Sequence, residues 1–165
     1  MNNRRKVREY VLMALYAFEL NGDPREVIMK MILTPRLDQD IPKEDTEDRE
    51  FGKKLFLSTV DHREEADSII KEQLKNWDME RLALIDKIVL RMALTEILNF
   101  SDIPVKVSIN EAIEIAKNFS TANSGKFVNG ILDSACQLLQ NEGKITKSGR
   151  GLIEHTPKKS NSEKN

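Results

Sequence analysis

The sequence predicts an all-α protein. Aromatic residues make up only 5% of its 165 residues, and alternation of Val, Ile or Thr with polar residues is hard to find. Only 7 Gly and 5 Pro punctuate the chain. Hydrophobic residues at 39% can build a core, and charged residues at 32% suit a well-solvated helical surface. These observations favour helices over a sandwich or barrel, in one domain or in two small subdomains.

Two helices are predicted in the first part of the chain. Apolar residues recur at helical spacing over residues 4–20, and Asn21-Gly22 ends this first helix. Asp23-Pro24 starts a short second helix, with Asp as the N-cap and Pro at the first helical position. Pro35 and Pro42 then bracket a polar loop.

The middle of the chain predicts two further helices and a short turn. The third helix spans about residues 46–60, and Asp61 with Glu64 resembles a capping box that starts the fourth. The apolar stripe of the fourth helix ends at Trp77. Asp78 can cap a short turn that follows it.

The last three helices carry the strongest apolar patterns. Apolar residues nearly encircle the segment 85–100, which predicts a central helix buried on most sides. Ser108 and Glu111 form a clean capping box for the next helix. The final helix is predicted over residues 124–141, and Gly143 is placed to end it.

The segment SGKFVNGILD, residues 124–133, has an unusual composition for a core helix. Gly130 lies in its middle, although Gly costs about 1 kcal/mol relative to Ala inside a helix. We interpret Gly130 as a point where another helix approaches closely, and Asn129 as a hydrogen-bond partner of a neighbouring backbone. Lys126 stands at the front of this helix, where free N–H groups attract anions.

Charge is distributed unevenly along the chain. The net charge is −1, but residues 1–8 carry +4 and residues 144–165 carry +4, so residues 9–143 carry −9. Basic ends on an acidic body predict two kinds of partner surface. The Lys-, Ser- and Gly-rich residues 144–165 are expected to form a disordered tail.

No pattern of catalytic or metal-binding residues emerges. His62, His155 and the single Cys136 form no zinc motif, and Cys136 lies among apolar residues as an inert core thiol would. Ser-Gly-Lys at 124–126 lacks the upstream glycine and the Ser/Thr of a Walker A loop. We therefore expect neither enzymatic activity nor a cofactor or metal. One cysteine and no apolar run of about 18 residues favour a cytoplasmic protein without a membrane span.

Binding is the function that these residues favour. A cluster of cations begins the chain and could contact successive phosphates: Arg4, Arg5, Lys6 and Arg8. A frayed, soluble N-terminus explains their charge equally well. Lys126 and the N–H groups near Ser124 form a second anion-attracting point, for which a plain cap and a surface lysine are the simpler explanation. Phe127 could stack on a base, although Phe at this spacing is more often part of the core.

Four segments, in this order and at this spacing, resemble the NusB family: VREYVLMALYAFEL, WDMERLALIDKIVLRMALTEIL, DIPVKVSINEAIEIAKNF and SGKFVNGILD. The likeness covers about residues 4–139. It implies an all-helical fold of two small bundles, about residues 1–77 and 78–143, before the tail. It also implies a role in transcription antitermination and ribosomal RNA synthesis. In that role, boxA, a short single-stranded RNA element, is bound together with NusE, a small-subunit ribosomal protein, and the pair joins other Nus factors on RNA polymerase.

The resemblance also implies binding residues. Those facing RNA are Arg4, Arg5, Lys6, Arg8, Ser124, Lys126 and Phe127. Those facing NusE are Tyr16, Glu80 and Asp86. An acidic surface there would suit a basic ribosomal protein. Asn123 stands where some relatives carry an acid, a change that would reduce repulsion of RNA.

Alternative functions stay open at this point. One is a helical scaffold that binds only protein. Another is an RNA-targeting module that acts with a ribosomal RNA methyltransferase, because NusB-like domains also occur fused to such enzymes. That function needs a second, cofactor-binding domain with a Gly-rich turn, for which the chain is too short. A homodimer is also open, because some relatives self-associate through the surface that RNA would use.

Overall fold

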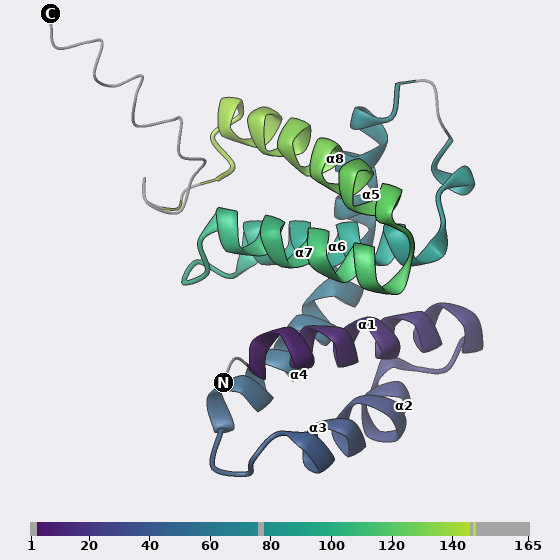
Figure 1. Cartoon of the computed structure of the whole chain (residues 1–165), viewed down its shortest axis with the longest axis vertical. Coiled ribbons are helices and arrows are strands. Elements are labelled where there is room, and N and C mark those ends of the chain that lie inside the picture. Colours follow the sequence, from purple (N-terminus) through teal and green to yellow (C-terminus); the bar gives the residue numbers. More distant parts are fainter. Residues whose placement is uncertain (1–2, 76–77, 146, 148–165) are drawn as a thin grey trace, which may run out of the picture.

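The structure is a computed structural model that describes residues 3–75, 78–145 and 147. All regular secondary structure in these residues is helical, as predicted. Figure 1 shows two stacked bundles, with α1 to α4 in the lower one and α5 to α8 in the upper one. The elements in order are α1 (Asn3–Asn21), α2 (Arg25–Ile28), the π-helical turn η1 (Met29–Leu33), α3 (Thr34–Asp40), α4 (Thr46–Asp61), α5 (Arg63–Gln73), the 3₁₀ turn η2 (Met79–Arg81), α6 (Leu84–Asn99), α7 (Val105–Phe119) and α8 (Ala122–Asn141).

The first bundle is built on the packing of α1 against α4. Val7 and Val11 of α1 are fully buried there. Gly52 of α4 allows the close approach, because a Cβ at this position would lie 2.7 Å from Cγ1 of Val7. The Asp45 side chain caps α4 by accepting a hydrogen bond from the Asp48 N–H at 3.4 Å.

The chain between α1 and α4 differs from the prediction. We expected a polar loop between Pro35 and Pro42, but α2, η1 and α3 form one nearly continuous helical segment that passes through Pro35. Pro35 lies in the first turn of α3, directly after the π-helical turn, where a missing N–H donor is tolerated. Leu33 and Leu37 are fully buried. The gain from burying these side chains outweighs the tendency of proline to end a helix.

Helix α6 is the centre of the second bundle, as predicted. Leu90 and Leu94 are fully buried, and α5, α7 and α8 all pack against α6. Helix α5 packs on α6 and α8, and also touches α4. Trp77 itself lies outside the described residues. Helix α6 also packs on α1 and α4, so one hydrophobic core runs through both bundles.

The first residues after α8 have defined contacts. Gly143, with φ +71°, ends the helix as predicted. Ile145 packs against the core, and the Lys147 ammonium donates to the backbone carbonyls of Glu96, at 3.2 Å, and Ile103. Burial lowers the pKa of Lys147. The rest of the predicted disordered tail, residues 146 and 148–165, lies outside the described part of the chain.

Two predicted capping boxes do not form. The Asp61–Glu64 pair does not cap α5, whose N-cap residue is His62 without a capping side chain. The Ser108–Glu111 pair lies inside α7, which begins three residues earlier, and both side chains bond to other helices. Tertiary hydrogen bonds therefore replace the local ones that the sequence pattern predicted.

Candidate functional site

The N-terminal arm, defined here as Asn3–Arg8 at the start of α1, holds its first two arginines in ion pairs. The Arg4 guanidinium lies 2.6 Å from Asp48 and 4.1 Å from the centre of the Phe51 ring. Arg5 donates two hydrogen bonds to Glu111 of α7, at 2.8 and 2.9 Å. The Arg5 side chain is still 42% exposed, so one face of this cation stays open to solvent.

Lys6 and Arg8 complete the arm and differ completely in exposure. Lys6 is exposed, as an RNA-binding residue would be. Arg8 is only 4% exposed and binds Glu96 of α6 through two hydrogen bonds, at 2.7 and 2.9 Å. The Ser108 hydroxyl also donates to Glu96, at 2.8 Å. Arg8 therefore holds the two bundles together in this structure, and its buried guanidinium is not available to a phosphate.

The ion pair between Arg5 and Glu111 shifts the pKa values of both residues. The hydrogen bonds from Arg5 are the main cause that lowers the pKa of Glu111 below its usual range. The same hydrogen bonds raise the pKa of Arg5. Both shifts favour the charged forms, so this pair is fully ionised at neutral pH.

The second element is the α8 start, defined here as Thr121–Phe127. Thr121 caps the helix by accepting a hydrogen bond from the Ser124 N–H at 3.2 Å. Ser124 is 6% exposed, and its hydroxyl donates to Asp86 of α6 at 3.1 Å. Lys126 is exposed, and Phe127 is half-buried against the core. Ser124 is thus a contact between α6 and α8, whereas Lys126 and one face of Phe127 can reach a ligand.

The glycine with a packing role in α8 is not the predicted one. Gly130 is exposed, and a Cβ there would meet no atom within 4 Å. At Gly125 a Cβ would lie 2.6 Å from Cγ of Lys117 and 3.5 Å from Ile113, both in α7. Asn129 is exposed as well. Gly125, rather than Gly130, allows α8 to approach its neighbour.

Helix α7 connects the two cationic elements. The arm binds it at Glu111, and the α8 start packs on it at Ile113 and Lys117. Glu111 and Lys117 are six residues apart, which corresponds to about 9 Å along a helix axis. Asn110 and Lys117 of α7 are exposed, and Glu114, between Glu111 and Lys117 in the helix, lies 3.3 Å from the Lys117 ammonium. Both cationic elements therefore contact the same helix.

The three residues expected to face a protein partner do not form one exposed set. Tyr16 of α1 is 39% exposed, and Glu80 in η2 is exposed. Asp86 is only 8% exposed and accepts the hydrogen bond from Ser124. Asp86 therefore links α6 to α8 at their first turns, and its assignment to an exposed partner surface is not supported by its position.

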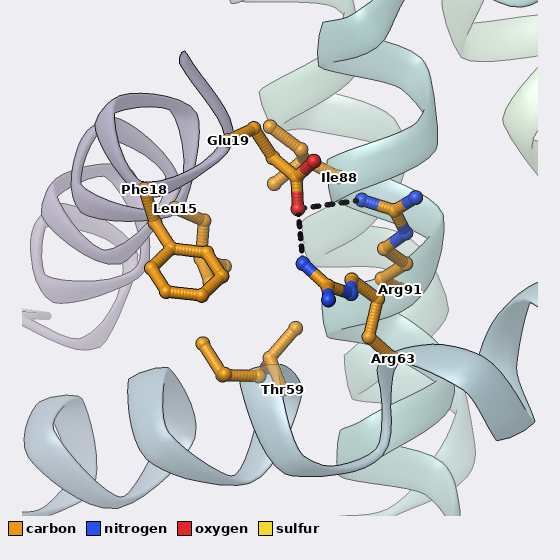
Figure 2. Close-up of a pocket in the computed structure, with 8 residues that line it drawn as sticks. Leu15, Phe18, Glu19, Thr59, Arg63, Ile88 and Arg91 are labelled. Carbon is orange, nitrogen blue, oxygen red and sulfur yellow. Dashed lines mark hydrogen bonds and ion pairs between the residues drawn. The ribbon is translucent and has the colours of Figure 1, made fainter. Parts of the chain in front are cut away.

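A second ion-pair cluster between the bundles was not predicted. Figure 2 shows the Glu19 carboxylate of α1 between the guanidinium groups of Arg63 and Arg91. The distances are 2.8 Å to Arg63 and 3.4 Å to Arg91. Arg91 also binds Asp67 of α5, with its closest contact at 2.7 Å. Arg91 and Glu96, two of the four charged residues of α6, stand among apolar residues in its middle and last turns, and they were the sequence signal for these ion pairs.

Other chemistry is sparse among the described residues. No group of three or more His, Cys, Asp and Glu side chains there could hold a metal ion. Burial is the main cause that raises the pKa of Cys136 to about 12, as expected of an unreactive core thiol. In the part of the chain that the structure describes, no helix is long and apolar enough to cross a membrane.

The fold and these surfaces define an all-helical binding protein with two bundles joined by buried ion pairs. The chain belongs to the NusB family, which matches residues 5–137. The transcription antitermination protein NusB of Salinibacter ruber is 46% identical over 154 residues, which are 93% of this chain and 92% of that protein.

Solved structures agree with this assignment. The NusB structure from T. maritima is 37% identical, with a TM-score of 0.72, and the match covers 82% of this chain and 92% of that one. A crystal structure of the antitermination factors NusB and NusE in complex with double-stranded RNA is 25% identical, with a TM-score of 0.71. That match covers 84% of this chain and 98% of the other.

Proposed function

We propose that this chain is a transcription antitermination factor that binds boxA-type single-stranded RNA together with NusE and so supports transcription of ribosomal RNA. Membership of the NusB family, with relatives that carry this role in their names, supports the proposal most directly. The related NusB–NusE–RNA complex supports both partners. Other Nus factors and RNA polymerase complete the proposed assembly.

The RNA path that the geometry favours crosses α7. Arg5, whose neighbours Arg4 and Lys6 extend the cationic arm, binds Glu111 of α7, and the α8 start, which carries Lys126 and Phe127, packs on α7 at Lys117. Cations bind the phosphates, while Phe127 offers an aromatic face to a base. Arg8 and Ser124 act indirectly, by holding the arm and the α8 start in place.

The protein acts by binding rather than by catalysis and works in the cytoplasm. NusE is expected to bind where Tyr16 and Glu80 are exposed. Since Asp86 is buried, a variant that tests this surface is Glu80→Lys rather than a change at Asp86. Weaker binding of NusE with an unchanged melting temperature supports the assignment, and equal affinity rejects it.

The decisive experiment is a titration of boxA RNA and of a scrambled RNA, each with and without NusE. Tighter binding of boxA that increases with NusE is the expected result. Equal affinity for both RNAs, with NusE bound, would instead support a scaffold that binds only protein. A homodimer that competes with RNA would appear as a change in mass on adding RNA.

The arm is tested by the salt dependence of RNA binding. Lys6→Ala should lower the log–log salt slope by about 0.7, the value for one lost contact with a single strand. Lys30→Ala, at an exposed lysine in η1, is the matched control and should leave the slope unchanged. Glu111→Gln retains the cations of the arm and removes the carboxylate that binds Arg5, so it should strengthen RNA binding.

A further inference from the structure

The residues that follow α8 fold back onto the link between α6 and α7. We name the described ones, Gly143–Ile145 and Lys147, the C-terminal strap. Its backbone begins with a hydrogen bond from the Lys144 N–H to the Leu139 carbonyl at 2.8 Å, and Ile145 packs against the core. The strap lies beyond residues 5–137, the part of the chain that matches the NusB family. The family match therefore does not account for the contacts of the strap.

Lys147 ties the strap to two points at the α6–α7 link. Its ammonium donates to the backbone carbonyl of Glu96, in the last turn of α6, at 3.2 Å, and to that of Ile103 in the link. A cation is favourable here, because the carbonyl end of a helix carries partial negative charge. Burial is the main cause that lowers the pKa of Lys147, and the charge of Glu96 acts against this shift. Both the backbone and the carboxylate of Glu96 therefore attract the ammonium.

Glu96 connects Lys147 to the N-terminal arm through a series of alternating charges. The Glu96 carboxylate is only 2% exposed and accepts two hydrogen bonds from Arg8, at 2.7 and 2.9 Å. The Arg8 guanidinium also lies 4.0 Å from Glu111, and Glu111 binds Arg5 at 2.8 Å. Cations and anions thus alternate from Lys147 to Arg5, and salt screens the buried members of this series only weakly. The series ends at a cation that is 42% exposed, in the part of the arm proposed to bind RNA.

The position of the arm therefore depends on the last turn of α6. Glu96 is buried and holds Arg8, so a shift of that turn would displace Arg8 and the arm that carries it. Cations that are already fixed lose less conformational freedom when they bind a strand. We propose that Lys147 is a positioning residue for RNA binding, because it fastens the Glu96–Arg8 junction on which the arm is built. Through this junction Lys147 orients Arg5, and it makes no contact with RNA itself. The inference rests on the proposed function.

The first test replaces the ammonium of the strap. Lys147→Met keeps an unbranched side chain and removes the charge, so boxA RNA should bind about two- to tenfold more weakly, the cost of ordering one side chain on binding. The log–log salt slope should stay unchanged, because no phosphate contact is lost. Lys147→Arg retains a cation and should restore most of the affinity. Lys144→Met, at a lysine of the same strap whose side chain is 60% exposed, is the matched control and should bind like the original chain.

The second test identifies the residue through which Lys147 acts. In a double-mutant cycle, Lys147→Met should weaken RNA binding little further in an Arg5→Gln background, since both changes remove the same coupled effect. In a Lys126→Ala background, at the α8 start, Lys147→Met should keep its full effect, because Lys126 is not part of this series of charges. All titrations are made well below the melting temperature of each variant, so that unfolding does not contribute. Lys147→Gln replaces Lys147→Met if the latter does not fold, as judged by its melting curve.

Four outcomes would overturn the inference. One is an unchanged affinity of Lys147→Met for boxA RNA, whether or not its melting temperature falls, which would leave Lys147 a purely structural role. A second is a salt slope lowered by about 0.7, which would mean that Lys147 binds a phosphate directly. A third is an equal loss of affinity in Lys144→Met, and the fourth is full additivity with Arg5→Gln. Failure of the original chain to prefer boxA over the scrambled RNA would instead refute the proposed function, and this inference with it.

Discussion

The buried charged groups next to the N-terminal arm and next to the α8 start differ in how completely they are hydrogen-bonded. In the arm, Arg8 and Glu96 are both almost completely buried, and two short hydrogen bonds join them. Beside the α8 start, Asp86 of α6 is also buried, with 8% of the residue exposed, but only one of its oxygens has a donor among the described residues. Paired charges suit a structural junction, whereas an oxygen without a donor leaves the buried Asp86 carboxylate less well stabilised.

The exposed cations of the two regions complete the comparison. Lys6 and Lys126 are exposed, while Arg8 is buried and binds Glu96 of α6. Proximity in sequence therefore does not define the binding surface, because Lys6 and Arg8 point to different environments although they are two residues apart. The predictions below test this division, from the largest expected effect to the smallest.

Removing Arg8 should cause the largest loss of stability. Arg8→Ala leaves the Glu96 carboxylate buried without its charged partner, which typically costs about 3–5 kcal/mol. The measurement is urea unfolding. Arg5→Ala is the matched control, because Arg5 is partly exposed, and it should cost about 1 kcal/mol or less. Equal losses for the two variants would show that Arg8 is not the junction between the bundles.

Reversing the charge at Asp86 should destabilise the fold to a smaller but clear extent. Asp86→Lys places a cation at the N-terminal ends of two helices and leaves Ser124 without its acceptor, at a cost of about 2–3 kcal/mol. Thermal unfolding measures the effect. Glu80→Lys, at an exposed position in η2, should leave the melting temperature nearly unchanged. A fully stable Asp86→Lys would restore Asp86 as a candidate for an exposed partner surface.

Replacing each of two glycines of α8 by alanine should change the stability of the protein in opposite directions. Gly130→Ala should stabilise the protein by about 1 kcal/mol, because the position is exposed, open and inside a helix. Gly125→Ala should destabilise it, because the new Cβ would lie 2.6 Å from the Lys117 side chain. Both variants can be compared by urea unfolding in one series. A destabilised Gly130→Ala would point to a contact at this position that the structure does not contain.

The Arg5–Glu111 pair should produce a small dependence of stability on pH. The pKa of Glu111 is lowered in the folded state. The stabilising contribution of Glu111 is therefore fully present above its ordinary pKa of 4.5 and is lost as pH falls through the lowered pKa. The effect should be below about 1 kcal/mol, since Arg5 is partly exposed. Unfolding curves between pH 3 and pH 6 should show that Glu111→Gln loses less stability on acidification than the original chain does.

Much of the helical architecture could be predicted from local patterns. Periodic apolar residues predicted α1, α4 and α6 to α8 within a few residues, and the encircled pattern of α6 predicted its central position. The helix through Pro35 was missed, because the tendency of proline to end a helix is a stronger sequence signal than the apolar spacing of so few residues. Ser108 and Glu111 matched a capping box by spacing, but their side chains reach Glu96 and Arg5 in other helices.

The candidate site was predictable only in part. Its exposed members Lys6 and Lys126, and its partly exposed members Arg5 and Phe127, were recognised as residue types that suit RNA. Burial divided them from Arg8, Ser124 and Asp86, and no sequence pattern predicted that division. The Glu19 cluster in Figure 2 was missed for the same reason, because ion pairs between residues far apart in the chain leave only isolated charges in the sequence.

The sequence by itself determined the fold class, the family and the residue types that can bind an anionic strand. Periodicity and composition suffice for this, because they act over a few turns of helix. Only the tertiary structure decided which charged side chains form ion pairs, which glycine allows close packing, and that Asp86 and Phe127 line the same pocket. The physical reason is that pairing, burial and pocket shape depend on distances between helices, which the chain acquires only when both bundles close on α6.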